Sequence, residues 1–167
     1  MKYFITIIMF MTSLSASAQN GKATTGKKTF SRTTTISQYI DAGPSIVWAL
    51  LTNASDFSRW NSTVVSIEGE IQEGEKIRLR STLDPNRTFK LKIKEIIPNQ
   101  KLVWGDALGK RTFILEKKGD QTLFKMSERI GGLMFPIFAN KIPSFDESFE
   151  KFTADLKKEA ETIARSK

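Results

Sequence analysis

The stretch that decides the fold is 77-IRLRSTL-83 together with 89-FKLKIKEI-96. Apolar and charged side chains alternate along both segments. Successive side chains of a β-strand point to opposite faces, so this alternation predicts two strands that each have one dry face and one wet face. The dry face carries Ile77, Leu79, Phe89, Leu91 and Ile93, and the wet face carries Arg78, Arg80, Lys90, Lys92 and Lys94. The pattern is typical of an antiparallel sheet that is covered on one side only.

Further strand-like segments lie on either side of this pair. The sequence predicts six strands, at residues 64–71, 76–83, 88–97, 102–106, 111–117 and 123–130, with turns that include Asp84-Pro85-Asn86 and Gly119-Asp120. A run rich in β-branched residues, at residues 29–40, predicts one more strand near the start. We therefore expect a sheet of seven strands.

Helical spacing appears at two places in the chain. Pro44 suits the first turn of a helix, and the apolar residues that follow it have helical spacing; a second short helix is expected over residues 55–60. Near the C-terminus, Ser144 and Glu147 match a capping box. The long amphipathic helix that follows has an apolar stripe of Phe145, Phe149, Phe152, Leu156, Ala160 and Ile163. The predicted fold is α+β, a curved seven-stranded antiparallel sheet around one long C-terminal helix, with two short helices after the first strand.

The N-terminal segment has the features of an export signal. Lys2 precedes a short apolar run at residues 3–11, and Ala16-Ser17-Ala18 is a small-x-small cleavage site. The run is too short to span a bilayer, which needs about 20 residues. We predict a signal peptide at residues 1–18, cleavage before Gln19, and a periplasmic or secreted protein. Residues 19–28 are expected to be a disordered leader, and residues 29–167 a single domain.

The composition excludes several kinds of chemistry. The 167 residues include no Cys and no His, so disulfides, thiol nucleophiles, Cys/His zinc sites and imidazole bases are ruled out. We expect no cofactor and no metal. The formal net charge is +8, but the basic face of the sheet lacks interleaved aromatic residues for stacking bases. We therefore expect a solvated face and no nucleic-acid partner, with weak contact with an anionic membrane as the alternative, and a monomer.

Several motifs resemble the polyketide cyclase/dehydrase-like branch of the START/birch-pollen-allergen (SRPBCC) superfamily. They are 42-AGPSIVWALLT-52, 57-FSRWN-61, 74-GEKI-77, 102-LVW-104 and 124-FKMSE-128. The resemblance spans about residues 36–164 and implies a helix-grip fold with a hydrophobic cavity between the sheet and the long helix. Relatives often carry Pro after the position of Asn61 and His at the position of Met126. Their helix often continues through the position of Pro143. The missing His makes acid–base chemistry less favourable here.

The resemblance implies a carrier or binder of a small hydrophobic molecule, such as a lipid, a sterol, or an aromatic or polyketide-like compound. Two alternatives stay open. One is a cyclase/dehydratase-type enzyme in which Glu128 acts as acid or base. The other is lipid transfer at an anionic membrane surface, with residues 131–143 opening as a lid. Periodicity does not show whether residues 135–142 form a helix or a lid, or whether the space beneath the sheet is filled.

The candidate ligand-binding residues lie on the dry face, at the expected cavity mouth and on the C-terminal segment. They are Trp60, Asn61, Leu79, Ser81, Phe89, Leu91, Trp104, Arg111, Phe113, Phe124, Met126, Glu128, Phe135, Phe138, Phe145 and Phe149. Trp60-Asn61 would form an amphipathic gate or, alternatively, a packed turn. No residue is assigned as catalytic, with Glu128 the one weak candidate.

Arg111 and Glu128 are the most informative polar pair among these candidates. If Gly119-Asp120 is a two-residue hairpin loop, the two residues lie opposite each other on the dry face. A charged pair is costly there unless it is mutually satisfied or hydrated. It would either hold a polar group of a ligand or form a structural salt bridge.

Overall fold

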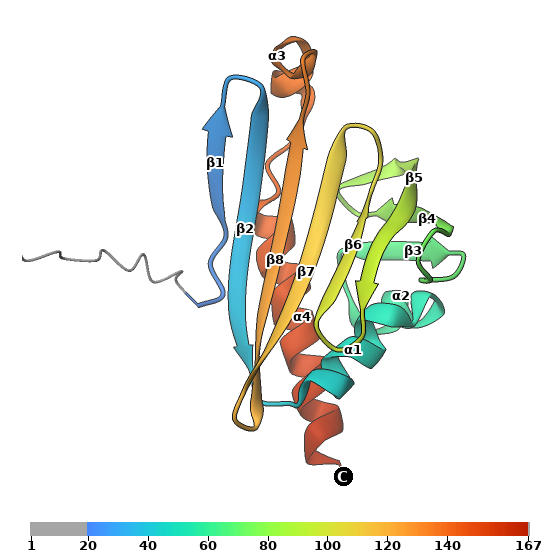
Figure 1. Cartoon of the computed structure of the whole chain (residues 1–167), viewed down its shortest axis with the longest axis vertical. Coiled ribbons are helices and arrows are strands. Elements are labelled where there is room, and N and C mark those ends of the chain that lie inside the picture. The colour runs from blue at the N-terminus through green and yellow to red at the C-terminus, as the bar shows by residue number, and fades with distance from the viewer. Residues whose placement is uncertain (1–19, 167) are drawn as a thin grey trace, which may run out of the picture.

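The protein is an α+β fold built on one open antiparallel sheet. The computed structural model describes residues 20–166, and the predicted signal peptide (residues 1–18) lies outside them. The eight strands lie in the order β1-β2-β8-β7-β6-β5-β4-β3, and all pairs are antiparallel (Figure 1). Their bounds are β1 Thr24–Lys28, β2 Ser31–Ile40, β3 Val64–Glu68, β4 Lys76–Ser81, β5 Asp84–Ile97, β6 Lys101–Gly105, β7 Gly109–Lys118 and β8 Gln121–Gly131.

The eighth strand, β1, lies in the segment that was expected to be a disordered leader. The prediction of disorder for residues 19–28 is therefore wrong for residues 24–28, which pair with β2 along their whole length. The Thr25 hydroxyl lies 2.7 Å from that of Thr34 and also donates a hydrogen bond to Asp146. Backbone pairing and these hydroxyl contacts order a strand that has no apolar alternation of its own.

The register of the β7–β8 hairpin agrees with the sequence prediction. Gly119 has a φ of 62°, which favours glycine, and Lys118 pairs with Gln121 across the two-residue turn. Arg111 consequently stands opposite Glu128.

The turn between β4 and β5 departs from the prediction. It lies at residues 82–83 instead of Asp84-Pro85-Asn86, because Ser81 pairs with Asp84. Arg80 then pairs with Thr88, so residues 85–87 are absorbed as an irregularity at the start of β5.

The helices follow the apolar spacing closely. They are α1 Pro44–Thr52, α2 Phe57–Trp60, α3 Phe135–Phe138 and α4 Asp146–Arg165, with 3-10 turns η1 Ala54–Asp56 and η2 Ala139–Lys141. The predicted capping box at α4 does not form: Phe145 occupies the N-cap position and makes no side-chain cap, and Glu147 pairs with Lys151. Asp146 and Glu147 instead place negative charge in the first turn, where it favours the helix dipole.

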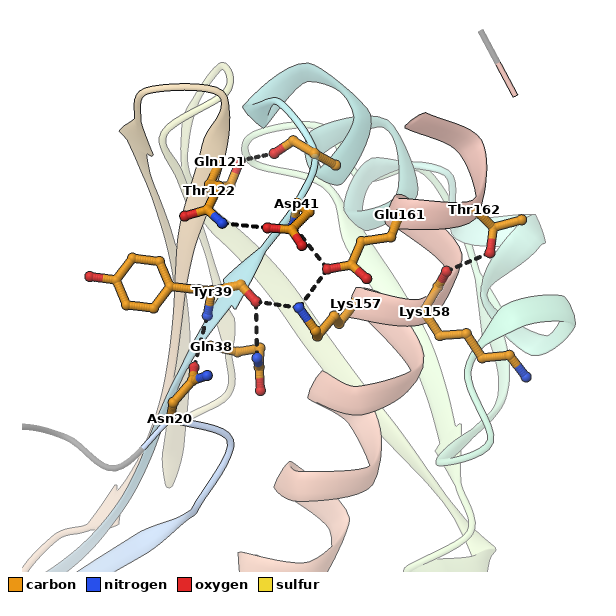
Figure 2. Close-up of polar contacts among 11 residues, drawn as sticks. Asn20, Gln38, Tyr39, Asp41, Gln121, Thr122, Lys157, Lys158, Glu161 and Thr162 are labelled. Carbon is orange, nitrogen blue, oxygen red and sulfur yellow. Dashed lines mark hydrogen bonds and ion pairs between the residues drawn. The ribbon is translucent and has the colours of Figure 1, made fainter. Parts of the chain in front are cut away.

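A network of polar contacts fastens the C-terminal half of α4 to the sheet (Figure 2). Lys157 donates to the carbonyl oxygen of Tyr39 at 2.9 Å and to Glu161, and Glu161 accepts a hydrogen bond from the Asp41 N–H at 2.9 Å. Gln121, the first residue of β8, donates to the Asp41 carboxylate. This end of the molecule is therefore held by several elements at once.

Candidate functional site

A cavity of about 250 Å³ lies between the sheet and the segment that leads into α4. It is at the end of the sheet that carries α3, away from the network of Figure 2 (Figure 1). Strands β3–β8 supply its walls, and residues 138–148 cover it. The interior of the protein is thus part cavity and part solid core.

Aromatic rings fill the other part of the interior. Trp104 forms the boundary, because it lines the cavity and also packs edge-on against Phe113, with ring centroids 4.8 Å apart. Beyond it, Phe113 lies 5.9 Å from Phe152, and Phe152 lies 6.3 Å from Phe57. These rings are buried and close-packed, so they determine where the cavity ends.

Many of the predicted ligand-binding residues come together around the cavity. They lie on five strands, on the cover and at the start of α4, and are Leu79, Ser81, Phe89, Leu91, Trp104, Arg111, Glu128, Phe138 and Phe145. The alternation of β4 and β5 explains their convergence, since every second residue of each strand faces inward.

The other predicted lining residues do not reach this cavity. Phe113, Phe124, Met126 and Phe149 are fully buried in the core, and Phe135 lines a separate surface hollow beside β1. The structure corrects the expectation that they line the cavity. The sequence pattern identifies the correct face of the sheet, but the aromatic rings of the core occupy the space in front of these residues.

Asn61 adopts the packed-turn arrangement. Its side-chain amide donates to the Phe152 carbonyl at 3.2 Å, and its side-chain oxygen accepts hydrogen bonds from the backbone and the hydroxyl of Thr63. The ring of Trp60 packs against that of Phe57, with the centroids 5.0 Å apart. Neither Trp60 nor Asn61 lines the cavity, so the gate arrangement is not present.

Arg111 and Glu128 are two of the charged residues that line the cavity. Their side chains form an ion pair and are only 19% and 15% exposed. The Arg111 guanidinium also lies 5.1 Å from the centroid of the Phe149 ring, and Phe149 stacks on Phe145 with the planes 6° apart. One cation is therefore held by a carboxylate and an aromatic face at once.

A second arginine, Arg32 on β2, holds the cover of the cavity closed. Its guanidinium donates to the carbonyl oxygens of Ile142 and Pro143, at 3.1 and 2.6 Å, and lies 4.9 Å from the centroid of the Phe145 ring. Burial lowers the pKa of Arg32 from its ordinary value, and the charges of Asp146 and Glu128 oppose that shift. We call Arg32 with residues 142–145 the latch.

Several lining residues were missed because they lie in turns, where no periodicity indicates a direction. The β4–β5 turn and the start of β5 contribute Leu83, Asp84 and Arg87, the β6–β7 turn contributes Asp106 and Leu108, and the cover contributes Lys141, Ile142 and Pro143. Only the turn-forming residues in the sequence indicated that these positions lie at the same end of the sheet.

The described part of the chain offers no cluster of metal ligands. Within residues 20–166, no three His, Cys, Asp or Glu side chains come together to hold a metal ion. No helix in the same range combines the length and apolar character needed to cross a membrane.

Comparison with known proteins identifies a family. Residues 41–161 match the family described as "Activator of Hsp90 ATPase homolog 1-like protein". This family is SRPBCC/START-like, in agreement with the resemblance found in the sequence. No curated protein resembles the chain closely enough in sequence to count as a match.

Solved structures share the fold at low sequence identity. A conserved protein of unknown function from Enterococcus faecalis has a TM-score of 0.62 and 20% identity, over 85% of this chain and 78% of its own. A START superfamily protein from Mycobacterium smegmatis has a TM-score of 0.58 and 14% identity, over 78% of this chain and 98% of its own. CalU16 from Micromonospora echinospora has a TM-score of 0.52 and 18% identity, over 87% and 96%. At these identities the likeness shows the fold alone.

Proposed function

The chain belongs to the family of Activator of Hsp90 ATPase homolog 1-like proteins, and from that premise we propose that it binds a small hydrophobic molecule inside a helix-grip fold. The observation that carries the proposal is the cavity between the sheet and the start of α4. Ligand sites are typically concave and mostly apolar, with a few convergent polar groups. This cavity has that composition, with apolar walls on β4 and β5 and the Arg111–Glu128 pair on β7 and β8.

The size of the cavity restricts the ligand. At about 250 Å³, it is slightly smaller than the roughly 300–1,000 Å³ of typical ligand pockets. A molecule of one or two rings, or a short acyl chain, suits the closed form. A sterol or a full lipid requires the latch to open. Arg111 and Glu128 would orient a hydroxyl, carbonyl or carboxylate group of the ligand, since one donates and the other accepts.

Binding of prodan, a neutral apolar fluorophore with a two-ring naphthalene core, tests the proposal. We expect saturable binding close to one molecule per chain. Leu91 lines the cavity, so Leu91→Trp should fill it and weaken binding at least tenfold. Leu123→Trp is the matched control, because Leu123 neighbours the inward-facing Phe124 on β8 and points to the other side. Absence of saturable binding, or equal effects of the two substitutions, would contradict the proposal.

A second candidate is a cyclase/dehydratase-type enzyme. It is favoured by one observation, that the Glu128 carboxylate lies on the cavity wall, where it can contact a ligand. The pairing of Glu128 with Arg111 and the Met at position 126 favour binding instead. If Glu128→Gln abolished a ring closure or a dehydration while ligand affinity was retained, the enzyme would replace the binder as our conclusion.

We also propose that the protein is exported and functions in the periplasm or outside the cell. The support is the charged, apolar and small-residue sequence of residues 1–18.

A further inference from the structure

Three turns meet at the end of the sheet that carries the cavity mouth. They are the β1–β2 turn, the β6–β7 turn and the turn between β8 and α3. The Gly131 N–H donates to the Leu108 carbonyl in the β6–β7 turn, and the Gly132 N–H donates to the Phe30 carbonyl in the β1–β2 turn, both at 3.0 Å. A side chain at Gly131 would lie 2.6 Å from the Phe30 carbonyl oxygen, so glycine is needed for this close approach. The three turns therefore form one continuous surface at the top of Figure 1.

Large apolar side chains are exposed on this surface. Leu133 is 87% exposed, Ile137 71% and Met134 61%, and Phe30 and Leu108 are about half exposed. We call these five residues the apolar tip. Their exposure does not result from poor local packing, because the neighbouring Phe135 is buried. Its ring packs edge-on against the ring of Phe138, with the centroids 5.7 Å apart. Contiguous exposed apolar side chains of this kind mark an interaction site.

Basic side chains surround the apolar tip. The exposed Lys27, Lys28, Lys110, Arg129 and Lys141 have no ion-pair partner among residues 20–166. Lys110 and Arg129 stand directly opposite each other on β7 and β8. Such like-charge pairing destabilises a sheet. The exposed Asp106 carboxylate lies nearby, but it accepts hydrogen bonds from the Leu108 and Gly109 N–H groups of its own turn.

We propose that the apolar tip and its ring of lysines and arginine dock the protein on an anionic phospholipid surface. Apolar side chains at the centre would enter the interfacial region of the bilayer, and each nearby cation would gain from the negative surface potential. A membrane suits this arrangement better than a protein partner, since a flat anionic surface with an apolar interior matches the charge ring and the centre together. The docking surface does not depend on what the cavity binds.

Docking would also place the cavity mouth at the lipid surface. Leu108 belongs to both the apolar tip and the cavity lining, and Phe138, the last residue of α3, lines the cavity. A ligand would then pass between the bilayer and the cavity without crossing water, a consequence that rests on the proposed function.

Co-sedimentation with phosphatidylcholine vesicles, with and without phosphatidylglycerol, tests the docking surface. We expect binding that needs phosphatidylglycerol and weakens as salt is added. Ile137→Ser should weaken it about tenfold through lost apolar contact, whereas Ile97→Ser, an exposed apolar residue on the β5–β6 side of the sheet, should not. Lys28→Gln with Lys110→Gln should weaken it about tenfold or more, and Lys117→Gln with Lys158→Gln should leave it nearly unchanged.

All variants share the same N-terminal segment, so differences among them report the docking surface alone. Circular dichroism checks that each variant is folded. The proposal is overturned if the parent protein does not bind the anionic vesicles, or if the control substitutions weaken binding as much as those at the tip. It is also overturned if light scattering shows a dimer that Ile137→Ser dissociates and vesicle binding is absent.

Discussion

Arg111 on β7 and Glu128 on β8 lie directly opposite each other and form an ion pair on the cavity-facing side of the sheet. Both side chains are mostly shielded from solvent, and an aromatic ring covers the guanidinium. Each charge therefore depends on the other for compensation, and the pair responds to mutation as a unit.

Removing one member of this pair should cost more stability than removing both. We expect Arg111→Met to lower the free energy of unfolding by about 3 kcal/mol, the lower end of the range for breaking a buried pair. Adding Glu128→Leu should recover more than half of that loss. Lys101→Met, in the more exposed Lys101–Glu95 pair, is the control and should cost less than about 1 kcal/mol. Urea denaturation of the parent, the two single variants Arg111→Met and Glu128→Leu, the double variant and Lys101→Met measures these differences. A double variant as unstable as the sum of its singles would refute the coupling.

The segment that leads from the end of β8 towards α4, residues 131–142, should open more readily than the helix that follows it. Residues 131–142 contain a four-residue helix and a 3-10 turn, whereas residues 149–160 lie within one long helix. Backbone amides of the first segment should exchange hydrogen faster, and Arg32→Gln should accelerate exchange further by removing the latch. Arg129→Gln on the exposed face is the control. Hydrogen-exchange mass spectrometry measures the difference, and equal protection of the two segments would rule out a lid.

Substitutions of core and of cavity aromatic residues should affect stability and ligand binding differently. Phe124 is fully buried in the solid core beside the cavity. Phe124→Ala should therefore lower the free energy of unfolding by roughly 3–5 kcal/mol and leave fluorophore affinity nearly unchanged. Phe145 is only partly buried and lines the cavity, so Phe145→Ala should cost less stability and change affinity more. Thermal denaturation and fluorescence titration of the same samples provide the test; parallel changes in both would show that the two regions are one.

Acid should weaken the packing of α2 through the Asp56–Arg59 pair. Arg59 donates hydrogen bonds to both Asp56 oxygens, at 2.7 and 2.8 Å, and this lowers the pKa of the Asp56 carboxyl. Because folding lowers this pKa, the ionised carboxylate stabilises the fold at pH values above the unfolded pKa, which is near 4. This contribution is lost as the pH falls through the folded pKa. Asp56→Asn should therefore be less stable than the parent at neutral pH, with the difference shrinking below about pH 4. Asp120→Asn, in an exposed turn, is the control, and a difference constant with pH would exclude the mechanism.

Export should remove the N-terminal segment. Cleavage after Ala18 leaves Gln19 as the first residue, which can cyclise and block sequencing chemistry. Mass spectrometry of protein recovered from the periplasm or the medium should give the mass of residues 19–167. Intact Met1 on soluble cytoplasmic protein would contradict the prediction.

The sequence predicted the sheet well wherever burial imposes alternation. Ile77, Leu79 and Ile93 are buried as expected, and the basic residues beside them are exposed. The Arg111–Glu128 pairing also followed, because a two-residue turn fixes the register of its hairpin. These features depend on local rules, which one sequence contains.

What the sequence could not give depends on contacts between distant segments. Strand β1 reads TTGKK and is specified by pairing with β2, not by its own residues. Phe124 and Leu91 both face inward, yet only Leu91 reaches the cavity, since Phe124 is packed in the core beside Phe113, with ring centroids 6.2 Å apart. Asn61 was open to two interpretations until Phe152 provided its hydrogen-bond acceptor.

The polar edge strand β1 has a consequence for colloidal behaviour. An unprotected sheet edge is a template for pairing with another chain, and short, lysine-bearing edge strands suppress this. β1 covers the ten-residue β2, whose threonine- and isoleucine-rich sequence has high β-propensity. Truncating the chain up to Lys28 would expose that edge, and the product would be expected to aggregate through strand addition while its cavity stayed intact.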